Sequence, residues 1–337
     1  MHSLGASMSN STRKTEPGLD RDAVVRALGL NPDQATWRLI KSVSTECEQR
    51  EVFLLDHTDR SSLVVKHESR GSEEHFAQLL GCYRALEDAT KGSRAFHMAP
   101  LVWANSERQI LVLDHVPGLT AYARLQASEI ELDTRADVLR QCGAWLRHLH
   151  SETSVVQFDG NGMLRRVRRF AQRTRNGEHE AAYPKKFLGI CAFMHQLMRA
   201  ADGAACKYGL RHGDAHSRNF IFGRDGLYGI DPLPRGDGPA ALDVARFMTR
   251  LGYSFGVERS GERGLAGLNA ADWVAFGSGY GHPSQDDPVL HVLFCHQLFN
   301  DWLQIPAKKE LRAQSEQRRI ERILMMFQTL RDQLGRD

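Results

Sequence analysis

The chain has 337 residues, of which 42% are hydrophobic and 25% charged, and its formal net charge is +3. This length predicts about two domains, and the composition is that of an ordinary globular protein. A charge so near neutrality gives no support for a nucleic-acid partner. No apolar run reaches the ~18 residues of a membrane span, so no membrane partner is expected. The six cysteines include no Cys-x2-Cys pair, which argues against a zinc site.

The first residues, 1–19, are rich in Ser, Asn, Thr and Lys, and this composition predicts a disordered tail. They lack the basic start and apolar core of a secretion signal, so we expect a cytoplasmic protein. Beyond them, runs of aliphatic and β-branched residues separated by polar turns predict three antiparallel strands, over 37–42, 51–56 and 62–67. A helix is predicted over 72–88.

Lys66 stands near the end of the third predicted strand, in the apolar run Leu63-Val64-Val65-Lys66. Taken alone, it is interpreted most simply as an edge-strand lysine, because a charge on an edge strand discourages aggregation. A later strand is predicted over 109–116, and the Pro117-Gly118 pair that ends it suits a linker between domains.

The middle and last parts of the chain are predicted to be helical. Apolar residues at helical spacing predict a helix over 134–151, and one amphipathic helix is predicted over 306–337. Six arginines fall between positions 165 and 175. They suit either the solvated face of a helix or a patch that attracts an anionic substrate or partner. If such a patch faced the active site, a cationic aminoglycoside would be a poor substrate.

Residues 211–231 combine two carboxylates and a carboxamide around a predicted hairpin. Asn219 follows Asp214 by five positions and Asp231 follows it by 17, with two strand-like runs and a turn at Gly226 between them. Phosphoryl transfer through a loose transition state needs a carboxylate that orients the acceptor hydroxyl and oxygen ligands that hold Mg²⁺ beside the phosphates. Asp214 suits the first role, as catalytic base, while Asn219 and Asp231 suit the second.

Two residues near this motif are expected to have structural roles. His212 precedes the Gly213-Asp214 loop, where a buried histidine donor would fix the loop's backbone. Asp243 follows a turn and stands at the start of a predicted helix, where an acid caps the helix or complements its dipole.

The pattern His-Gly-Asp-x4-Asn at 212–219, followed by Ile230-Asp231, resembles the catalytic loop and metal-binding aspartate of the aminoglycoside phosphotransferase and choline kinase-like superfamily. Protein kinases carry His-Arg-Asp and Asp-Phe-Gly instead. The resemblance implies an α+β, bilobal, protein-kinase-like fold with a small antiparallel-sheet N-lobe and a larger, mainly helical C-lobe. It also implies that Asp243 braces the catalytic loop. The implied divisions are a nucleotide-binding lobe at 20–113, a hinge at 114–118 and a catalytic and acceptor-binding lobe at 119–337.

The resemblance implies a set of nucleotide contacts as well. Lys66 resembles the strand-three lysine that contacts the α and β phosphates in kinases. The first predicted turn has no glycine, so hydroxyl and backbone groups there would contact the phosphates, and backbone groups at the hinge would hold adenine. The glutamate that pairs with the lysine is missing from its expected position, which is Cys82. The remaining implied contacts are Ser44 and Thr45 in the turn, and Asp114, His115 and Val116 at the hinge.

The sequence therefore predicts transfer of the γ-phosphoryl group of ATP, or alternatively GTP, to a hydroxyl of a small molecule such as an amino alcohol, sugar or nucleoside, with Mg²⁺ as cofactor. One alternative is an aminoglycoside antibiotic kinase of the streptomycin type, which clustered acids in the C-lobe would favour. Another is a catalytically silent nucleotide-binding regulatory module, which the missing glutamate and glycines support and the intact Asp214, Asn219 and Asp231 oppose. The acceptor and the oligomeric state stay open.

Overall fold

The computed structural model describes residues 18–44, 49–69, 72–234, 236–256, 261–281 and 285–335. Internal contacts divide the chain into two compact units: the first holds the chain up to Ala77 with Leu101–His115, and the second holds Gln78–Pro100 with Val116–Asp337. The division after His115 falls within the segment predicted as a hinge. Residues 78–100, which the sequence prediction placed in the N-lobe, group with the second unit because strand β4 within them pairs in parallel with β11.

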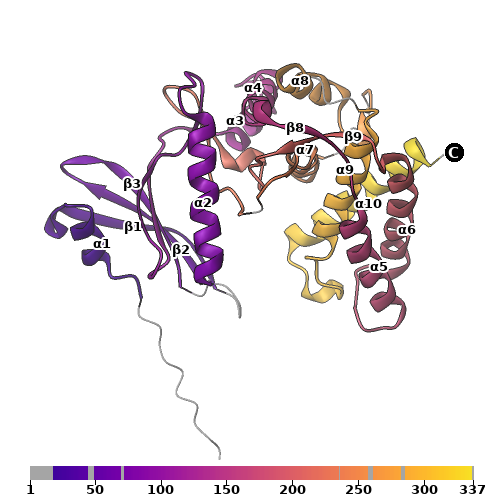
Figure 1. Cartoon of the computed structure of the whole chain (residues 1–337), viewed down its shortest axis with the longest axis horizontal. Helices are drawn as coiled ribbons and strands as arrows, with labels where there is room; N and C mark the ends of the chain where they lie inside the picture. The colour runs from indigo at the N-terminus through magenta and orange to yellow at the C-terminus, as the bar shows by residue number, and fades with distance from the viewer. Residues whose placement is uncertain are drawn as a thin grey trace, which may run out of the picture. The chain divides into compact units, whose positions relative to one another are not determined.

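The first unit is built on a five-stranded antiparallel sheet in the order β1-β2-β3-β6-β5. Figure 1 labels its first three strands. The three predicted N-terminal strands are confirmed as β1, β2 and β3, and each extends beyond its predicted bounds. Burial alternates along β3, so Leu63 and Val65 lie on one face of the sheet and Lys66 on the other. The bounds are β1 Ala35–Ser44, β2 Gln49–His57, β3 Arg60–Glu68, β5 Leu101–Asn105 and β6 Ile110–Asp114, with a 3-10 turn, η1, at Pro32–Gln34.

Helix α1 (Arg21–Ala27) covers one face of this sheet and was not predicted from the sequence. The Asp20 side chain caps it by accepting a hydrogen bond of 3.0 Å from the Ala23 N–H. Val24 and Val25 are buried in one cluster with the apolar side chains of β2, β3 and β6. A helix of 7 residues with two buried positions gives too short a periodic pattern to be recognised.

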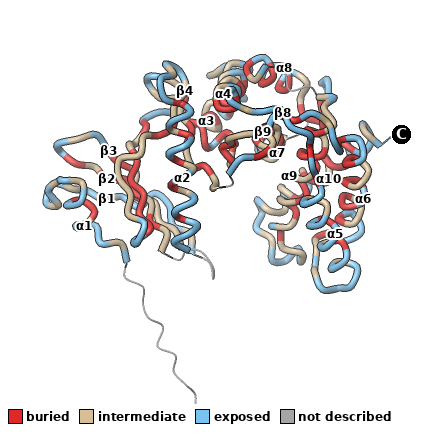
Figure 2. The backbone as a smooth tube through the Cα atoms, viewed as in Figure 1, coloured by how far each residue is buried: buried red, intermediate tan, exposed pale blue. Residues whose placement is uncertain are grey.

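The second unit is mainly helical and holds most of the aromatic core. Buried positions dominate α9, whereas α5 is mostly exposed (Figure 2). Within α5, only Val167 and Ala171 are buried. The helices predicted over 72–88 and 134–151 are confirmed as α2, which begins in the first unit, and α4. The bounds are α2 Glu73–Thr90, α3 Ala121–Ser128, α4 Arg135–Leu149, α5 Asn161–Arg175, α6 Pro184–Ala201, α7 Ala241–Phe255, α8 Ala270–Tyr280, α9 Pro288–Trp302 and α10 Gln314–Leu334.

Two small sheets lie within this unit, in the orders β4-β11-β10-β7 and β12-β9-β8. The first contains the hairpin predicted around Gly226. The Trp145 indole of α4 donates a hydrogen bond of 3.1 Å to the His97 carbonyl of β4, which fixes this sheet against the helical core. The strands are β4 Phe96–Met98, β7 Leu119–Thr120, β8 Ser154–Gln157, β9 Ala205–Gly209, β10 Phe220–Phe222, β11 Leu227–Gly229 and β12 Gly238–Pro239; the 3-10 turns are η2 His150–Glu152, η3 Ser217–Asn219, η4 Leu265–Gly267 and η5 Lys309–Leu311.

The single helix predicted over 306–337 is wrong in its first part. The Arg312 side chain donates to the Pro306 carbonyl at 2.8 Å, which folds this stretch back into a turn. Helix α10 begins only at Gln314, where the Glu316 carboxylate accepts the Ala313 N–H at 2.8 Å. No helix in the described part of the chain is long and apolar enough to cross a membrane.

Candidate active site

The β10–β11 hairpin brings the two predicted metal ligands to its open end. Phe220 pairs with Gly229, and just beyond this pair the Ile230 N–H donates to the Asn219 carbonyl at 3.0 Å. Asn219 is therefore a direct neighbour of Ile230, and Asp231 is the next residue along the chain. The turn requires glycine at position 226, because a Cβ there would lie 2.4 Å from the Ala95 carbonyl oxygen.

Asp231 is exposed and adopts a left-handed backbone conformation, with φ of 54°. Aspartate tolerates this region better than most residues do. Two residues on, the Leu233 N–H donates to the His212 carbonyl at 3.0 Å, which ties the segment after the hairpin to the loop that carries Asp214.

Asp243, in the first turn of α7, holds the loop that contains Asp214. Its two carboxylate oxygens accept the backbone N–H groups of His212 at 2.7 Å and Gly213 at 2.9 Å. The residue is fully enclosed, with 1% of its surface exposed. Burial alone would raise the pKa of the Asp243 carboxyl, but its hydrogen bond with His150 and the nearby positive charge hold that pKa below its usual range. The geometry is the bracing contact that the resemblance implied.

His150 and Tyr280 extend this brace, and neither was predicted from the sequence to belong to it. The His150 Nε2 lies 3.3 Å from Asp243 Oδ2, and its Nδ1 lies 2.9 Å from the Tyr280 hydroxyl. Because a carboxylate only accepts, His150 donates to Asp243 through Nε2, and its Nδ1 shares a hydrogen bond with the Tyr280 hydroxyl. A hydrogen-bonded chain thus runs from α8 through η2 and α7 to the loop.

His212 is completely buried, as predicted, and its contact with the loop's backbone is made by a ring nitrogen that accepts. The Asp214 N–H lies 3.3 Å from His212 Nδ1, so this ring nitrogen accepts a hydrogen bond where the sequence predicted that it donates. Burial lowers the pKa of His212, which favours the neutral ring that this contact requires. His212 therefore fixes the loop's backbone as an acceptor.

Asp214 is half-buried and held on both carboxylate oxygens. Arg246 Nε lies 2.7 Å from Oδ1, while Asn219 Nδ2 lies 3.2 Å and His216 Nε2 3.6 Å from Oδ2. Burial alone would raise the pKa of the Asp214 carboxyl, but the neighbouring His216 ring and the charge of Arg246 outweigh it and hold the pKa far below its usual range. Asp214 is therefore ionised at neutral pH.

Arg246 is a site residue that the sequence reasoning missed. It follows Asp243 by three positions in α7, and residues three apart in a helix lie on the same side. Once Asp243 was assigned to the loop, this spacing could have placed Arg246 beside Asp214.

The donor set at the hairpin's open end suits Mg²⁺. Asn219 Nδ2 also donates to the Asp214 carbonyl at 3.0 Å, so its Oδ1 is the atom left to bind a metal, and Asp231 adds a carboxylate. Hard divalent cations prefer such oxygen ligands and often take the rest from phosphates and water. Within the described ranges, no group of three or more His, Cys, Asp or Glu side chains could hold a metal ion by itself. A metal here would take its remaining ligands from phosphate or water.

An Asp231→Asn variant is expected to need about tenfold more Mg²⁺ for half-maximal activity, because it keeps an oxygen ligand but loses the charge. Asn tolerates the left-handed backbone, so the fold should be unchanged. Mg²⁺ titrations of activity at saturating nucleotide measure the effect, with Asp237→Asn, an exposed loop residue, as the matched control. Equal Mg²⁺ requirements in both variants would contradict the assignment of Asp231.

Gly213→Ala is expected to lower the free energy of unfolding by about 1–2 kcal/mol. Gly213 has φ of 75°, and an added Cβ would lie 2.9 Å from the Leu233 carbonyl oxygen. The matched control is Gly236→Ala, where φ is 58° and nothing lies within 4 Å of an added Cβ. Urea titrations measure the free energy of unfolding of both variants. The loss that both share reports backbone strain, and any further loss in Gly213→Ala reports the collision with Leu233. Equal losses would show that this collision costs nothing.

Lys66 lies on the middle strand of the first unit's sheet. Strand β3 pairs with β2 on one side and β6 on the other, with Lys66 opposite Val52 and Leu111. The interpretation as an edge-strand lysine is therefore wrong, because β3 has no free edge to protect. Its contact with phosphate stays a prediction.

Of the predicted turn that would cover the phosphates, the structure describes only the residues on either side of 45–48. Ser44 is the last residue of β1, is exposed, and lies opposite Gln49 at the start of β2. Thr45 lies outside the described residues. The hydroxyl of Ser44 is therefore placed at the edge of this turn, and its contact with a nucleotide stays a prediction.

The predicted hinge residues lie at the end of β6. The Asp114 carboxylate pairs with Arg60 Nη2 at 3.0 Å, and the His115 N–H donates to the Ser62 carbonyl at 3.0 Å. Because the His115 N–H already donates to Ser62, adenine could contact only the other backbone N–H and C=O groups of this segment. Val116 is buried and is the first residue of this segment in the second unit.

Asp214 lines a cavity of about 390 Å³ in the second unit, formed by η3, α7 and the start of α10. None of the arginines of α5 lines it; Arg168, Arg169 and Arg175 line cavities against α6 instead. The arginine cluster between 165 and 175 therefore does not face the cavity that contains Asp214.

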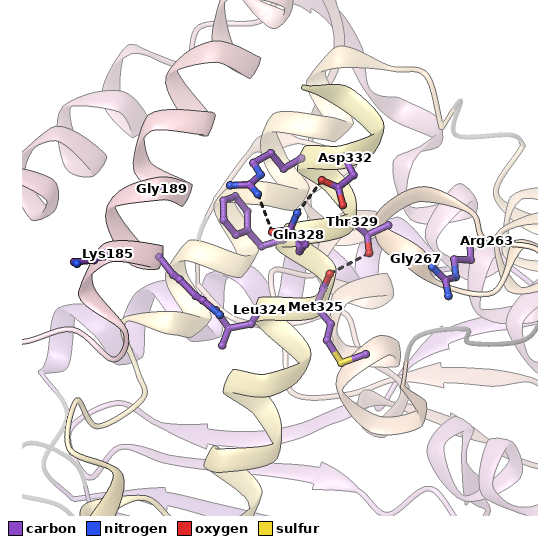
Figure 3. A pocket seen from close by; sticks show the side chains of 12 residues that line it. Lys185, Gly189, Arg263, Gly267, Leu324, Met325, Gln328, Thr329 and Asp332 are labelled. Carbon is purple, nitrogen blue, oxygen red and sulfur yellow. Dashed lines mark hydrogen bonds between the residues drawn. The ribbon is translucent and has the colours of Figure 1, made fainter. Parts of the chain in front are cut away.

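A larger cavity, of about 680 Å³, lies between α6, η4 and α10 (Figure 3). It shares no lining residue with the cavity at Asp214. Its Gln328 side chain accepts from Arg331 Nη2 at 2.9 Å and donates to Asp332 Oδ1 at 2.8 Å, so these polar groups satisfy one another. None of the described residues that line it belongs to the predicted phosphoryl-transfer motif.

The fold and the catalytic loop define a kinase-like phosphotransferase. Residues 40–280 match the phosphotransferase enzyme family, and the chain belongs to that family. This confirms the resemblance to aminoglycoside phosphotransferases and choline kinases drawn from the sequence. No curated protein matches the chain.

Solved structures show the same fold. An amicoumacin kinase with bound AMP-PNP and Ca²⁺ is 15% identical, with a TM-score of 0.56, and the match covers 92% of this chain and 94% of that one. An ADP-bound aminoglycoside phosphotransferase is 15% identical, with a TM-score of 0.55 and coverage of 91% and 96%. A choline kinase from Cryptosporidium parvum Iowa II is 11% identical, with a TM-score of 0.52 and coverage of 91% and 92%. These likenesses confirm the protein-kinase-like fold.

Proposed function

We propose that this phosphotransferase moves the γ-phosphoryl group of ATP to a hydroxyl group of a small molecule, with Mg²⁺ held by Asn219 and Asp231. The observation that carries the proposal is the Asp214 carboxylate, which is ionised, fixed by Asn219 and Arg246, and exposed to a cavity of about 390 Å³. Ligand sites typically span about 300–1,000 Å³, so this cavity suits a small acceptor.

Asp214 acts on the acceptor. Its carboxylate accepts a hydrogen bond from the acceptor hydroxyl and so directs the oxygen lone pair at the phosphorus atom. Because its pKa is far below neutral, Asp214 is a weak base, and it takes the proton only as the new oxygen–phosphorus bond forms. Arg246 and Asn219 keep the carboxylate from rotating. The metal, when bound, would neutralise charge on the phosphates.

The nucleotide contacts proposed from the resemblance are those of Lys66, the first turn and the segment that ends β6. Lys66 would bind the α and β phosphates, Ser44 and Thr45 would contact the phosphates from the first turn, and backbone groups of Asp114 to Val116 would hold the base. Two of the structural relatives contain AMP-PNP or ADP, which supports an adenine nucleotide over GTP.

The test is ATP consumption in the presence of Mg²⁺ across a panel of hydroxyl compounds, with the wild type and Asp214→Ala assayed side by side. We expect at least one compound to stimulate turnover in the wild type and none to do so in the variant. If ATP binds but no compound stimulates turnover, and Asp214→Ala behaves as the wild type does, the proposal is overturned in favour of a silent nucleotide-binding module.

A further inference from the structure

Positive charge dominates the cavity at Asp214. Its two acidic lining residues are Asp214 and Glu316, and they face twice as many arginines. Because a small, partly enclosed cavity concentrates the field of its charges, this excess attracts anions and repels cations. The four arginines come from η3, α7 and α10: Arg218, Arg246, Arg250 and Arg319.

Two of these arginines are neutralised by neighbouring carboxylates. Arg246 pairs with Asp214 at 2.7 Å, as described above. Arg250 Nη2 donates to Asp301 Oδ1 at 3.1 Å, and Asp301 is 1% exposed and also accepts from the Tyr253 hydroxyl at 3.0 Å. This buried carboxylate therefore fixes both Arg250 and Tyr253 at the cavity wall.

The other two arginines, Arg218 and Arg319, stand against the single carboxylate of Glu316, so the cavity keeps a net positive charge. The Arg218 guanidinium lies 3.5 Å over the ring of Tyr122, which orients it without cancelling its charge. Glu316 is one turn from Arg319, but its Oε2 accepts the Ala313 N–H at 2.8 Å and so caps α10. In the part of the chain that the structure describes, neither Arg218 nor Arg319 has an ion-pair partner, and the buried Nε of Arg319 has no hydrogen-bond acceptor.

We propose that the acceptor carries an anionic group, a carboxylate or a phosphate ester, which binds Arg319 and Arg218 while its hydroxyl binds Asp214. This inference rests on the function proposed above and narrows its substrate class. A guanidinium donates two parallel hydrogen bonds to either anion, and these charge-assisted contacts are roughly twice as strong as neutral ones. An aminoglycoside would bring further positive charge into a cavity that already has an excess of it.

The first experiment compares acceptors that share a carbon skeleton and differ in charge. Glycerate, glycerol and serinol form one set, and glucose 6-phosphate, glucose and glucosamine form a second, so the two sets distinguish carboxylate from phosphate. We expect kcat/KM to be at least tenfold higher for the anionic member of one set or both, and its KM to rise with ionic strength because salt screens the contact.

The second experiment assigns the effect to Arg319. Arg319→Gln is expected to raise KM for the preferred anion about tenfold or more, with kcat little changed, and Arg319→Lys is expected to restore part of the loss. The matched control is Arg318→Gln, on the same helix, because Arg318 is exposed, bonds to Gln314 at 3.0 Å and does not line the cavity. The control should have the wild-type KM.

The outcomes separate this inference from the function on which it rests. Preference for the neutral or cationic members, with turnover that still depends on Asp214, would overturn the anionic acceptor and leave the phosphotransferase in place. Equal KM values in Arg319→Gln and Arg318→Gln would also overturn it. Failure of every hydroxyl compound, charged or not, to stimulate turnover would instead count against the proposed function itself.

Discussion

An Asp214→Asn variant is expected to lose phosphoryl transfer, with kcat about 10²- to 10⁴-fold below that of the wild type. Asparagine has nearly the same shape, but it lacks the negative charge that orients the acceptor hydroxyl and receives its proton. The ion pair with Arg246 at 2.7 Å is lost as well, so the side chain is no longer held in place. Steady-state kinetics with the acceptor found in the panel measure the effect.

The matched control for this variant is Asp225→Asn, which removes the same charge from the exposed turn of the same hairpin. Its kcat should equal that of the wild type. Calorimetric titration with ATP should give the same affinity in all three proteins, because we assign Asp214 to the acceptor and not to the nucleotide. A wild-type kcat in Asp214→Asn would contradict its role.

Replacing Asp243 with Asn is expected to lower the free energy of unfolding by about 3 kcal/mol, because one buried side chain holds three partners. The carboxylate accepts from His212 at 2.7 Å, Gly213 at 2.9 Å and His150 at 3.3 Å. An amide can offer only one oxygen to them and brings two donors of its own. Urea unfolding of the full chain, followed by tryptophan fluorescence, measures the loss.

This loss should depend on pH in a defined direction. The pKa of Asp243 is lower in the folded chain than in the unfolded chain, so its stabilising contribution is complete above about pH 5 and disappears as the pH falls towards the folded pKa. The difference between the wild type and Asp243→Asn should therefore shrink in acid. The contribution of Asp214 is present in both proteins and cancels. Asp237 is exposed and lies before α7, so Asp237→Asn should have the stability of the wild type at every pH. If the stability difference between the wild type and Asp243→Asn grew as the pH fell, the role assigned to Asp243 would be contradicted.

The sequence predicted the parts of the site that are determined by short-range spacing. Asp214, Asn219 and Asp231 lie on one loop and one hairpin, and the turn at Gly226 fixes how that hairpin closes. The strand that carries Lys66 was predicted correctly for the same reason, because an apolar run between polar turns is a local signal. Its central place in the sheet was not predicted, since the order of strands depends on pairing with β6, far along the chain.

The residues that the sequence missed act over long range. His150 is 93 positions from Asp243, and Tyr280 is 130 positions from His150. No local pattern marks such contacts. Arg319 belongs to the same class, because only the packing of α10 near α7 brings it to the cavity at Asp214. The cavity at Asp214 is thus the part of this enzyme that a single sequence describes least.

Transfer of the γ-phosphoryl group to an acceptor hydroxyl at Asp214 can be followed by ³¹P NMR. The reaction contains Mg²⁺, the preferred anionic acceptor and ATP whose γ-phosphoryl oxygens carry ¹⁸O. We predict ADP and a phosphomonoester of the acceptor that retains the label, with neither formed by Asp214→Asn. Inorganic phosphate as the sole labelled product, or a labelled monoester formed equally well by the variant, would overturn the assignment of Asp214 to acceptor phosphorylation.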